Sequence, residues 1–335
     1  MNNSVEFGGY GDWIYLKLYL GQAIDRMDQL IVRLGQSVPE LTGVTRWFYI
    51  RYFDETGVHI RLRARPRRGS EEQLKNELSH LCSHLLNTLH ELVPGTYYPM
   101  VVPAGFDEAM QREGGGLGRI SNDVTMVAEQ YEPEIDKYGG FIGVTFAEDV
   151  FQTSSEVACQ ILADEAAGLY SRKDLIPLLM SDCVQAFVPE ADEEAFWREY
   201  SFYWLGGNTP AAGDWRAKFL EKSAELAELK VPVVADLSSL PSSAREFAAR
   251  WRTCLDVAAV RYRDRAAVAD ANNEVLSFNF AHLMNNRLGI SSLEEAYMST
   301  LLERHARAAG VGTTQPYVTR DAPLVLGVPA MGDEQ

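Results

Sequence analysis

The chain has 335 residues, of which 46% are hydrophobic and 23% charged, and it carries a formal net charge of −16. This composition is typical of a globular protein with a large core, and the acidic balance argues against nucleic-acid binding through the whole surface. No amino-terminal export signal or membrane-length apolar run is present and the four cysteines form no Cys-x-x-Cys pair, so we expect a cytoplasmic protein without a disulfide scaffold or zinc knuckle.

The first part of the chain predicts a small antiparallel sheet. Side chains alternate between 13 and 20, and aromatic and β-branched residues gather between 46 and 53, as is typical of strands. The turn residues Asp54-Glu-Thr-Gly57 predict a hairpin into a third strand, which Pro66 ends. The expected order is strand 13–20, helix 24–34, strand 46–53, strand 57–65, helix 70–92 opened by a capping box at Ser70, and strand 120–128. This β-α-β-β-α-β order is that of a ferredoxin-like fold.

Helical spacing dominates from about residue 141. We expect helices over 144–151, 155–170, 173–187, 193–205, 215–229, 243–262, 268–286 and 292–309. The sequence therefore predicts an α+β protein with a ferredoxin-like antiparallel sheet half over 1–140 and a mainly helical half over 141–310. We expect the helical half to pack on the sheet as one functional domain, followed by an irregular tail over 311–335.

The strand over 57–65 has the most informative pattern, because its cations all fall on odd positions. They are His59, Arg61, Arg63 and Arg65. A strand points such positions to one face, and burying so many cations is costly unless anions meet them. We interpret this face as a site for a negatively charged ligand; a solvated face paired with carboxylates across the sheet is the alternative.

Residues of the neighbouring strands are expected to complete this face. Tyr49 and Arg51 are predicted to share it and, with His59, to bind a polar organic substrate or an extended peptide. The alternative is a face that the later helices cover, with its hydroxyl groups satisfied internally.

Two later segments carry further candidate chemistry. Glu134 and Lys137 lie three residues apart and would share one side of a helical turn, either in a site or as a surface ion pair. His282 lies near the end of a predicted helix and is a candidate acid or base, with a purely structural histidine as the alternative. His80 and His84 have the spacing of metal ligands but lack the glutamate of a metalloprotease motif between them, so we expect no metal site.

Five segments, in this order, resemble one family. They are Trp13-Ile-Tyr-Leu-Lys-Leu-Tyr19, Trp47-Phe-Tyr-Ile-Arg-Tyr52, His59-Ile-Arg-Leu-Arg63, Tyr131-Glu-Pro-Glu-Ile-Asp-Lys-Tyr-Gly-Gly140, and His282 with Asn286-Arg-Leu-Gly289. Over most of its length the chain resembles the thiopeptide-type bacteriocin biosynthesis family, which is related to the C-terminal glutamate-elimination domain of class I lantibiotic dehydratases. The resemblance places the family's functional arginines on Arg61 and Arg63, its acid on Glu134 and its histidine on His282. Where the family has an arginine three residues after the acid, this chain has Lys137, which keeps the charge without the bidentate fork.

The resemblance implies an enzyme that removes the α-proton from glutamylated Ser or Thr of a precursor peptide and expels glutamate. The product would be dehydroalanine or dehydrobutyrine. His282 would act as acid or base, Arg61 and Arg63 would hold carboxylates, and Glu134 and Lys137 would orient these groups, without a metal or organic cofactor. A separate glutamyl-tRNA-dependent enzyme would supply the substrate, and this chain itself is expected to contact neither nucleic acid nor membrane.

Two other functions stay open. Stand-alone members of the same family act as thiopeptide pyridine synthases, which join two dehydroalanines in a formal (4+2) cycloaddition and then lose water and the leader peptide. The other is a noncatalytic protein that presents a precursor peptide, with the leader added to a sheet edge. The oligomeric state is also open, a homodimer included.

Overall fold

The computed structural model describes residues 13–54, 56–93, 123–263, 268 and 271–308. Its first part is one antiparallel sheet in the order β2-β3-β1-β4. The strands are β1 (Ile14–Leu20), β2 (Val44–Asp54), β3 (Gly57–Pro66) and β4 (Val124–Glu129), with α1 (Met27–Ser37) after β1 and α2 (Glu71–Asn87) after β3. This order of strands and helices is ferredoxin-like, as predicted.

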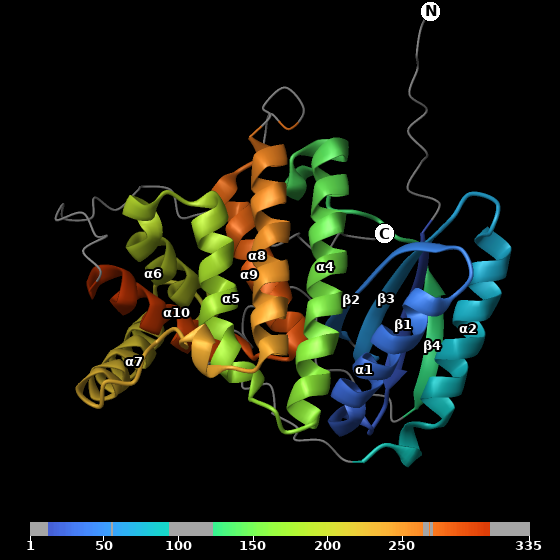
Figure 1. Ribbon diagram of the computed structural model, residues 1–335, viewed down its shortest axis with the longest axis horizontal. Coiled ribbons are helices and arrows are strands. Elements are labelled where there is room, and N and C mark those ends of the chain that lie inside the picture. Colours follow the sequence, from blue (N-terminus) through green and yellow to red (C-terminus); the bar gives the residue numbers. More distant parts are fainter. Residues whose placement is uncertain (1–12, 55, 94–122, 264–267, 269–270, 309–335) are drawn as a thin grey trace, which may run out of the picture.

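Helices make up the rest of the described chain and lie beside the sheet (Figure 1). They are α4 (Gly140–Ala166), α5 (Arg172–Phe187), α6 (Glu193–Trp204), α7 (Pro210–Glu228), α8 (Ser242–Tyr262), α9 (Asn273–Leu288) and α10 (Ser292–Ala308). Short 3₁₀ turns are η2 (Ile24–Arg26), η3 (Val38–Glu40), η4 (Leu89–Glu91), η5 (Asp136–Tyr138), η6 (Glu190–Asp192) and η7 (Leu237–Ser239). The predicted α+β class is confirmed. None of the helices in the described ranges is long and apolar enough to cross a membrane.

Two local predictions are wrong. The helices expected over 144–151 and 155–170 form the single helix α4. The polar residues Ser154 and Ser155 do not interrupt it, because both hydroxyls donate to the carbonyl of Phe151, at 3.1 and 2.8 Å. Helix α2 begins at Glu71 as expected, but the Ser70 side chain makes no capping hydrogen bond. The predicted tail over 311–335 lies outside the described residues.

The two faces of the sheet have different coverings. The even-numbered residues of β1 and β3 are buried on the face that carries α1, which lies in front of the sheet in Figure 1. They are Leu16, Leu18, Ile60, Leu62 and Ala64. The opposite face, which carries Arg61 and Arg63, therefore points away from the viewer. We call it the arginine face.

The helical half meets the sheet along strand β2, through α4 and α9. The outer backbone groups of β2 bond to side chains of these two helices. Tyr49 N–H donates to the Ser155 hydroxyl at 3.1 Å. Arg51 N–H donates to the Asn286 amide oxygen and its carbonyl accepts from the Asn286 amide nitrogen, both at 2.9 Å. Side chains thus replace the neighbouring strand that this sheet edge lacks.

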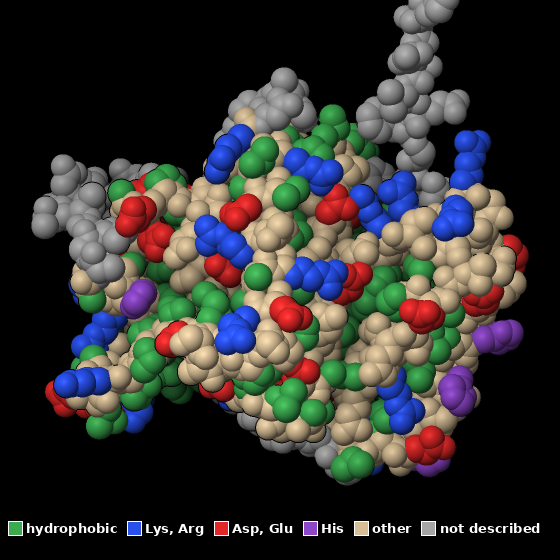
Figure 2. All heavy atoms as spheres, viewed as in Figure 1, with side chains coloured by type: hydrophobic (Ala, Val, Ile, Leu, Met, Phe, Trp, Pro, Cys, Tyr) green, Lys and Arg blue, Asp and Glu red, His purple; other side chains and the backbone are tan. Residues whose placement is uncertain are grey.

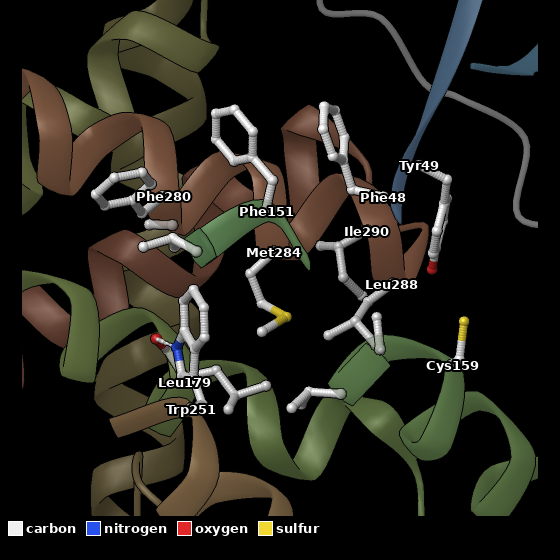
Figure 3. Close-up of a cluster of buried hydrophobic side chains, with 14 of the residues drawn as sticks. Phe48, Tyr49, Phe151, Cys159, Leu179, Trp251, Phe280, Met284, Leu288 and Ile290 are labelled. Atoms are coloured by element: carbon white, nitrogen blue, oxygen red, sulfur yellow. Dashed lines mark hydrogen bonds between the residues drawn. The ribbon is translucent and has the colours of Figure 1, made fainter. Parts of the chain in front are cut away.

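One hydrophobic core joins the sheet to the helices. Figure 3 shows part of it, where residues of β2 meet those of α4, α5, α8 and α9. Phe48 of β2 lies 5.3 Å from Phe151 of α4, measured between ring centroids, and Phe151 lies 6.4 Å from Phe280 of α9. Because these rings form a continuous chain of contacts, the position of α9 relative to the sheet is fixed by packing.

Candidate active site

The register of the sheet brings aromatic and cationic side chains together on the arginine face. His59, Arg61 and Arg63 of β3 lie opposite Tyr19, Lys17 and Tyr15 of β1. Phe48, Ile50 and Tyr52 of β2 lie opposite Arg63, Arg61 and His59. Directly opposite residues share a face of the sheet, so these side chains form one surface.

Arg63 lies in a cage of aromatic rings. Its guanidinium carbon is 4.5 Å from the ring centroid of Tyr15, 5.1 Å from that of Tyr131 and 5.4 Å from that of Phe48. The side chain is 8% exposed and its Nε has no hydrogen-bond partner. Burial lowers the pKa of the guanidinium, and the charge of Glu134 partly opposes this effect. No carboxylate among the described residues forms an ion pair with Arg63, so within that part of the chain aromatic rings and not a counter-ion surround this buried cation.

Arg61 is held in a fixed orientation beside this cage. Its guanidinium carbon lies 3.3 Å from the ring centroid of Tyr52, and its Nε donates to Nε2 of His59 at 3.3 Å. The ring of His59 is fully buried, and its Nδ1 lies 3.0 Å from the carbonyl of Gly57. Burial lowers the pKa of His59, so the neutral ring carries its proton on Nδ1 and accepts through Nε2. Among the described residues, no hydrogen bond or ion pair engages the terminal nitrogens of Arg61.

The placement of His59 therefore differs from the predicted substrate contact. The His59 ring is fully buried and makes a contact through each nitrogen, one to the Gly57 carbonyl and one to Arg61. It therefore orients the Arg61 side chain. The carboxylate of Asp54, at the end of β2, lies 3.8 Å from Nε2 of His59. It is held there by the Tyr19 hydroxyl, which donates to it at 2.9 Å, and by the backbone N–H of Thr56 at 3.0 Å.

The predicted pair of Glu134 and Lys137 is present at the turn before α4. The Lys137 ammonium lies 3.1 and 3.3 Å from the two carboxylate oxygens of Glu134. The Glu134 side chain is 44% exposed, yet its charge acts on Arg63. The pair thus lies at the solvent-exposed rim of the Arg63 cage.

His282 belongs to a second cluster, formed by α6, α9 and α10. Its Nδ1 donates to the carboxylate of Glu295 at 3.0 Å, and its ring centroid lies 4.4 Å from that of Trp204. The His282 side chain is 28% exposed, whereas Glu295 is fully buried. Glu295 also accepts from the Tyr200 hydroxyl and, at 3.2 Å, from the amide of Asn285. The imidazole is therefore held at Nδ1, while Nε2 makes no hydrogen bond within the described part of the chain.

Within the described residues no contact joins His282 to Arg61, Arg63, Glu134 or Lys137, and helix α9 links the His282 cluster to strand β2. His282 is four residues, or about one helical turn, before Asn286. The Asn286 side-chain amide bonds to both backbone groups of Arg51, the N–H and the carbonyl. The next residue is Tyr52, whose ring carries the Arg61 guanidinium. Helix α9 thus carries both His282 and the residue that binds the outer edge of β2.

The prediction that Tyr49 and Arg51 share the arginine face is wrong. Because Asp54 pairs with Gly57, even-numbered residues of β2 lie opposite odd-numbered residues of β3. Tyr49 therefore points to the other side, where it is fully buried and its hydroxyl donates to the carbonyl of Arg287 at 3.1 Å. Arg51 donates to the same carbonyl at 3.0 Å, so both side chains cap the end of α9.

Two buried ionisable residues near the arginine face were not predicted. Arg287 is fully buried, with one terminal nitrogen unbonded, and burial lowers its pKa to about 10. Glu148 of α4 is 1% exposed with one oxygen unbonded, and burial raises its pKa to about 7. The hydroxyl of Tyr131, whose ring covers Arg63, hydrogen-bonds to Glu148. The described residues contain no group of three or more side chains that could hold a metal ion.

Comparison with known proteins identifies the family. The structure is similar to that of a tRNA-dependent lantibiotic dehydratase, MibB from Microbispora sp. 107891, at 20% identity and a TM-score of 0.53. The alignment includes 91% of this chain but only 28% of MibB. The chain aligns over 90% of its length and 99% of TbtD, a pyridine synthase from thiomuracin biosynthesis, at 18% identity and a TM-score of 0.62. TsrL aligns over 91% of this chain and 99% of its own, at 16% identity and a TM-score of 0.50. No curated protein matches.

These identities are low enough that the structural likeness speaks for the fold alone. The match to a sequence family does assign the chain to a family, because the model described as "Lantibiotic biosynthesis dehydratase C-term" matches residues 13–306. The resemblance seen in the sequence is thereby confirmed, and the chain belongs to the lantibiotic dehydratase C-terminal family.

Proposed function

We propose that the chain eliminates glutamate from glutamylated Ser or Thr residues of a precursor peptide. The observation that carries this proposal is the Arg63 guanidinium, which is buried among aromatic rings without a carboxylate partner in the described part of the chain. A glutamyl ester made from glutamyl-tRNA has a free side-chain carboxylate, and its elimination releases a second one. Two oriented guanidiniums, on Arg63 and Arg61, suit such a substrate.

The elimination needs a base and a receiver for negative charge. Nε2 of His282 would take the proton from Cα of the esterified residue. The C–H electron pair becomes the Cα=Cβ bond, and the Cβ–O pair leaves with glutamate as a carboxylate. Arg61 and Arg63 would stabilise that carboxylate as its charge develops. The proton on His282 then passes to water, so atoms and charge balance without a cofactor.

Glu134 and Lys137 would act at the rim of the cage. Lys137 adds a cation whose ammonium can approach the glutamyl group, while its bond to Glu134 limits its reach. An ammonium is a point donor and lacks the planar fork of arginine. We therefore assign Lys137 to general attraction of the anionic substrate, and leave specific recognition to Arg61 and Arg63.

A pyridine synthase is the second candidate. It is favoured by the likeness to TbtD over nearly that whole protein and by the aromatic cage, which could stack a peptide bearing azole rings. The cycloaddition, however, joins two uncharged alkenes and releases no carboxylate. The guanidiniums of Arg61 and Arg63, which have no carboxylate partner among the described residues, would then have no charged group to bind, so we place elimination first.

The proposal includes partners that the chemistry requires. A separate enzyme would glutamylate the precursor peptide by using glutamyl-tRNA, and the peptide would then pass to this chain. Such a sequence of reactions would take place in the cytoplasm, where charged tRNA is available.

Mass spectrometry of the precursor peptide tests the proposal. One peptide carries glutamylated Ser, and the other carries two dehydroalanines together with its azoles. We expect glutamate to be lost from the first, with the rate reduced about 100-fold or more by Arg63→Ala or His282→Ala. Arg68→Ala is the matched control, because Arg68 is exposed after the end of the same strand.

The other outcomes separate the alternatives. An inert first peptide, together with macrocycle formation and leader release from the second, would establish the pyridine synthase. Binding of both peptides with no change in mass would leave only the presenting role.

A further inference from the structure

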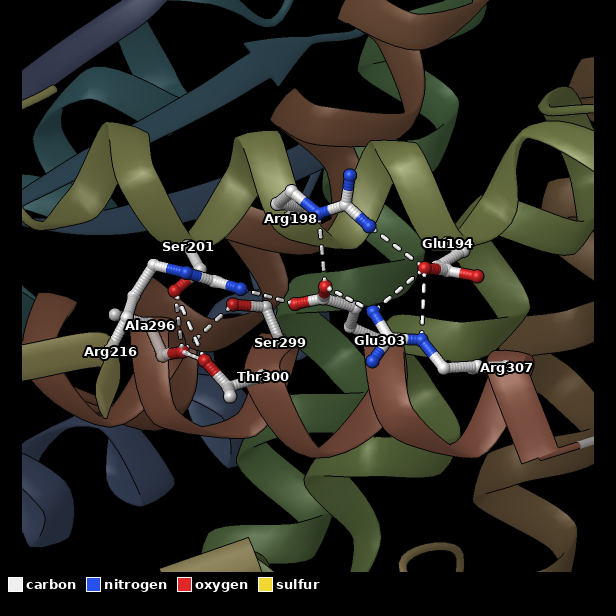
Figure 4. A network of polar contacts seen from close by, with 9 residues as sticks. All are labelled: Glu194, Arg198, Ser201, Arg216, Ala296, Ser299, Thr300, Glu303 and Arg307. Carbon is white, nitrogen blue, oxygen red and sulfur yellow. Dashed lines mark hydrogen bonds and ion pairs between the residues drawn. The ribbon is translucent and has the colours of Figure 1, made fainter. Parts of the chain in front are cut away.

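Glu295 is an unusual carboxylate within its own helix. It is fully buried, and its ion-pairing partner among the described residues is His282. Glu303, two turns later on α10, is also buried, but it binds the guanidiniums of Arg198, Arg216 and Arg307 (Figure 4). A buried carboxylate is costly without a cation or several donors. Glu303 has permanent cations, whereas Glu295 has neutral donors and an imidazole that can become charged.

The donors around Glu295 divide between its two oxygens. Oε2 accepts from the Tyr200 hydroxyl and, at 3.2 Å, from the Asn285 amide. Oε1 accepts from Nδ1 of His282 at 3.0 Å. Trp204 packs against the imidazole with its ring centroid 4.4 Å away and its plane tilted by 34°. The carboxylate is thus bound by three residues, and the imidazole is held by Glu295 and Trp204, so neither group can turn independently.

We infer that Glu295 is a positioning residue that keeps His282 protonated on Nδ1 and leaves Nε2 free to accept a proton. This inference rests on the proposed function, because it assigns His282 as the base. An ionised carboxylate can only accept, so Nδ1 must carry the hydrogen of the neutral ring. Once Nε2 takes the proton from Cα of the substrate, the imidazolium forms an ion pair with Glu295 in a buried, weakly screened position.

The Glu295→Gln substitution tests this arrangement because it should reverse the tautomer. The two donors at the Oε2 position, from Tyr200 and Asn285, would select the amide oxygen there. The amide NH₂ would then face Nδ1, which must accept and so lose its hydrogen. The proton of the neutral imidazole moves to Nε2, and the nitrogen that faces the substrate can no longer act as a base.

The first readout is the ¹⁵N NMR signature of the His282 ring in the full chain, measured at a pH where the ring is neutral and without substrate. We expect the wild type to show Nδ1–H and Glu295→Gln to show Nε2–H. Tyr200→Phe removes one donor from Oε2 and should leave the tautomer unchanged. Glu303→Gln is the matched control, because it changes a buried glutamate on the same helix and should cost stability without affecting the tautomer.

The second readout is the elimination rate on the glutamylated peptide. We expect Glu295→Gln to lower kcat about 100-fold with KM nearly unchanged, because the base is lost and not the anion site. Glu303→Gln should keep kcat. Retention of Nδ1–H in Glu295→Gln, or a reversed tautomer with unchanged kcat, would overturn the inference.

Failure of the proposed function has a different signature. If the wild type eliminates nothing but Glu295→Gln still reverses the tautomer, the positioning of His282 by Glu295 stands and the proposed reaction falls.

Discussion

Replacing Glu148 with glutamine should remove a pH-dependent loss of stability. The side chain is 1% exposed, and burial raises its pKa from 4.5 to about 7, against the opposing charges of Arg46 and Arg65. Since the folded pKa lies above the unfolded value, the folded protein binds more protons between these two pH values. The free energy of unfolding therefore falls as the pH rises through this window.

The size of the effect follows from the two pKa values of Glu148. Their difference corresponds to roughly 3 kcal/mol at high pH, of which about 2.5 kcal/mol accumulates between pH 5 and pH 8. Glutamine has nearly the same shape and does not ionise. We therefore expect Glu148→Gln to gain about 2.5 kcal/mol in free energy of unfolding, relative to the wild type, over this range.

Urea unfolding followed by tryptophan fluorescence at pH 5, 6, 7 and 8 measures this gain. Comparing each variant with the wild type at the same pH cancels the titration of the other groups. Glu156→Gln is the control, because Glu156 lies on the same helix and bonds to Gln152 at 2.9 Å and to Arg250 near the surface. A difference between Glu148→Gln and the wild type that stays constant from pH 5 to 8 would refute the reasoning.

Two further substitutions test the contacts at the end of α9. Gly289 has φ of 75°, and a Cβ there would lie 2.8 Å from Nη1 of Arg51, so Gly289→Ala should lower Tm more than Gly207→Ala, where φ is 89° and the space is open. Although burial raises the pKa of Asp28, the Arg51 and Arg172 guanidiniums hold it below its ordinary value. Asp28→Asn should therefore cost about 3 kcal/mol or more in urea unfolding at pH 7, and the difference from the wild type should shrink as the pH falls below 4.

The strands could be predicted because their signals are local. Alternation along 57–65 placed all four cations on one face, and the turn residues before them marked the hairpin. Residues 49 and 51 of the partner strand were assigned to the wrong face because the residues that share a face across a hairpin depend on which residues pair. Asp54 pairs with Gly57, and the alternation within each strand does not reveal this register. A shift of one residue moved Tyr49 and Arg51 to the opposite side of the sheet.

The candidate site could be predicted only in part. His282 was visible as a single histidine on a helix, but its partner Glu295 is 13 residues away and lies on another helix. Tyr200, which binds Glu295 in turn, is 82 residues before His282, and tertiary packing brings the three together. One signal was present: Glu295 occupies the same buried stripe of α10 as Ser299, Leu302 and Ala306. An acidic residue in an otherwise apolar or small-residue stripe indicates a buried partner, although the sequence does not say which one.

The hydrogen bonds between strand β2 and the helices determine how a fragment containing only the sheet would behave. Its outer backbone groups bond to Ser155 and Asn286, both of which lie far beyond the sheet in sequence. A fragment that ended before α4 would carry a bare strand with the N–H groups of Tyr49 and Arg51 unoccupied. Such an edge recruits strands from other molecules. The isolated sheet half should therefore self-associate, and supplying the helices as a separate chain should suppress that association.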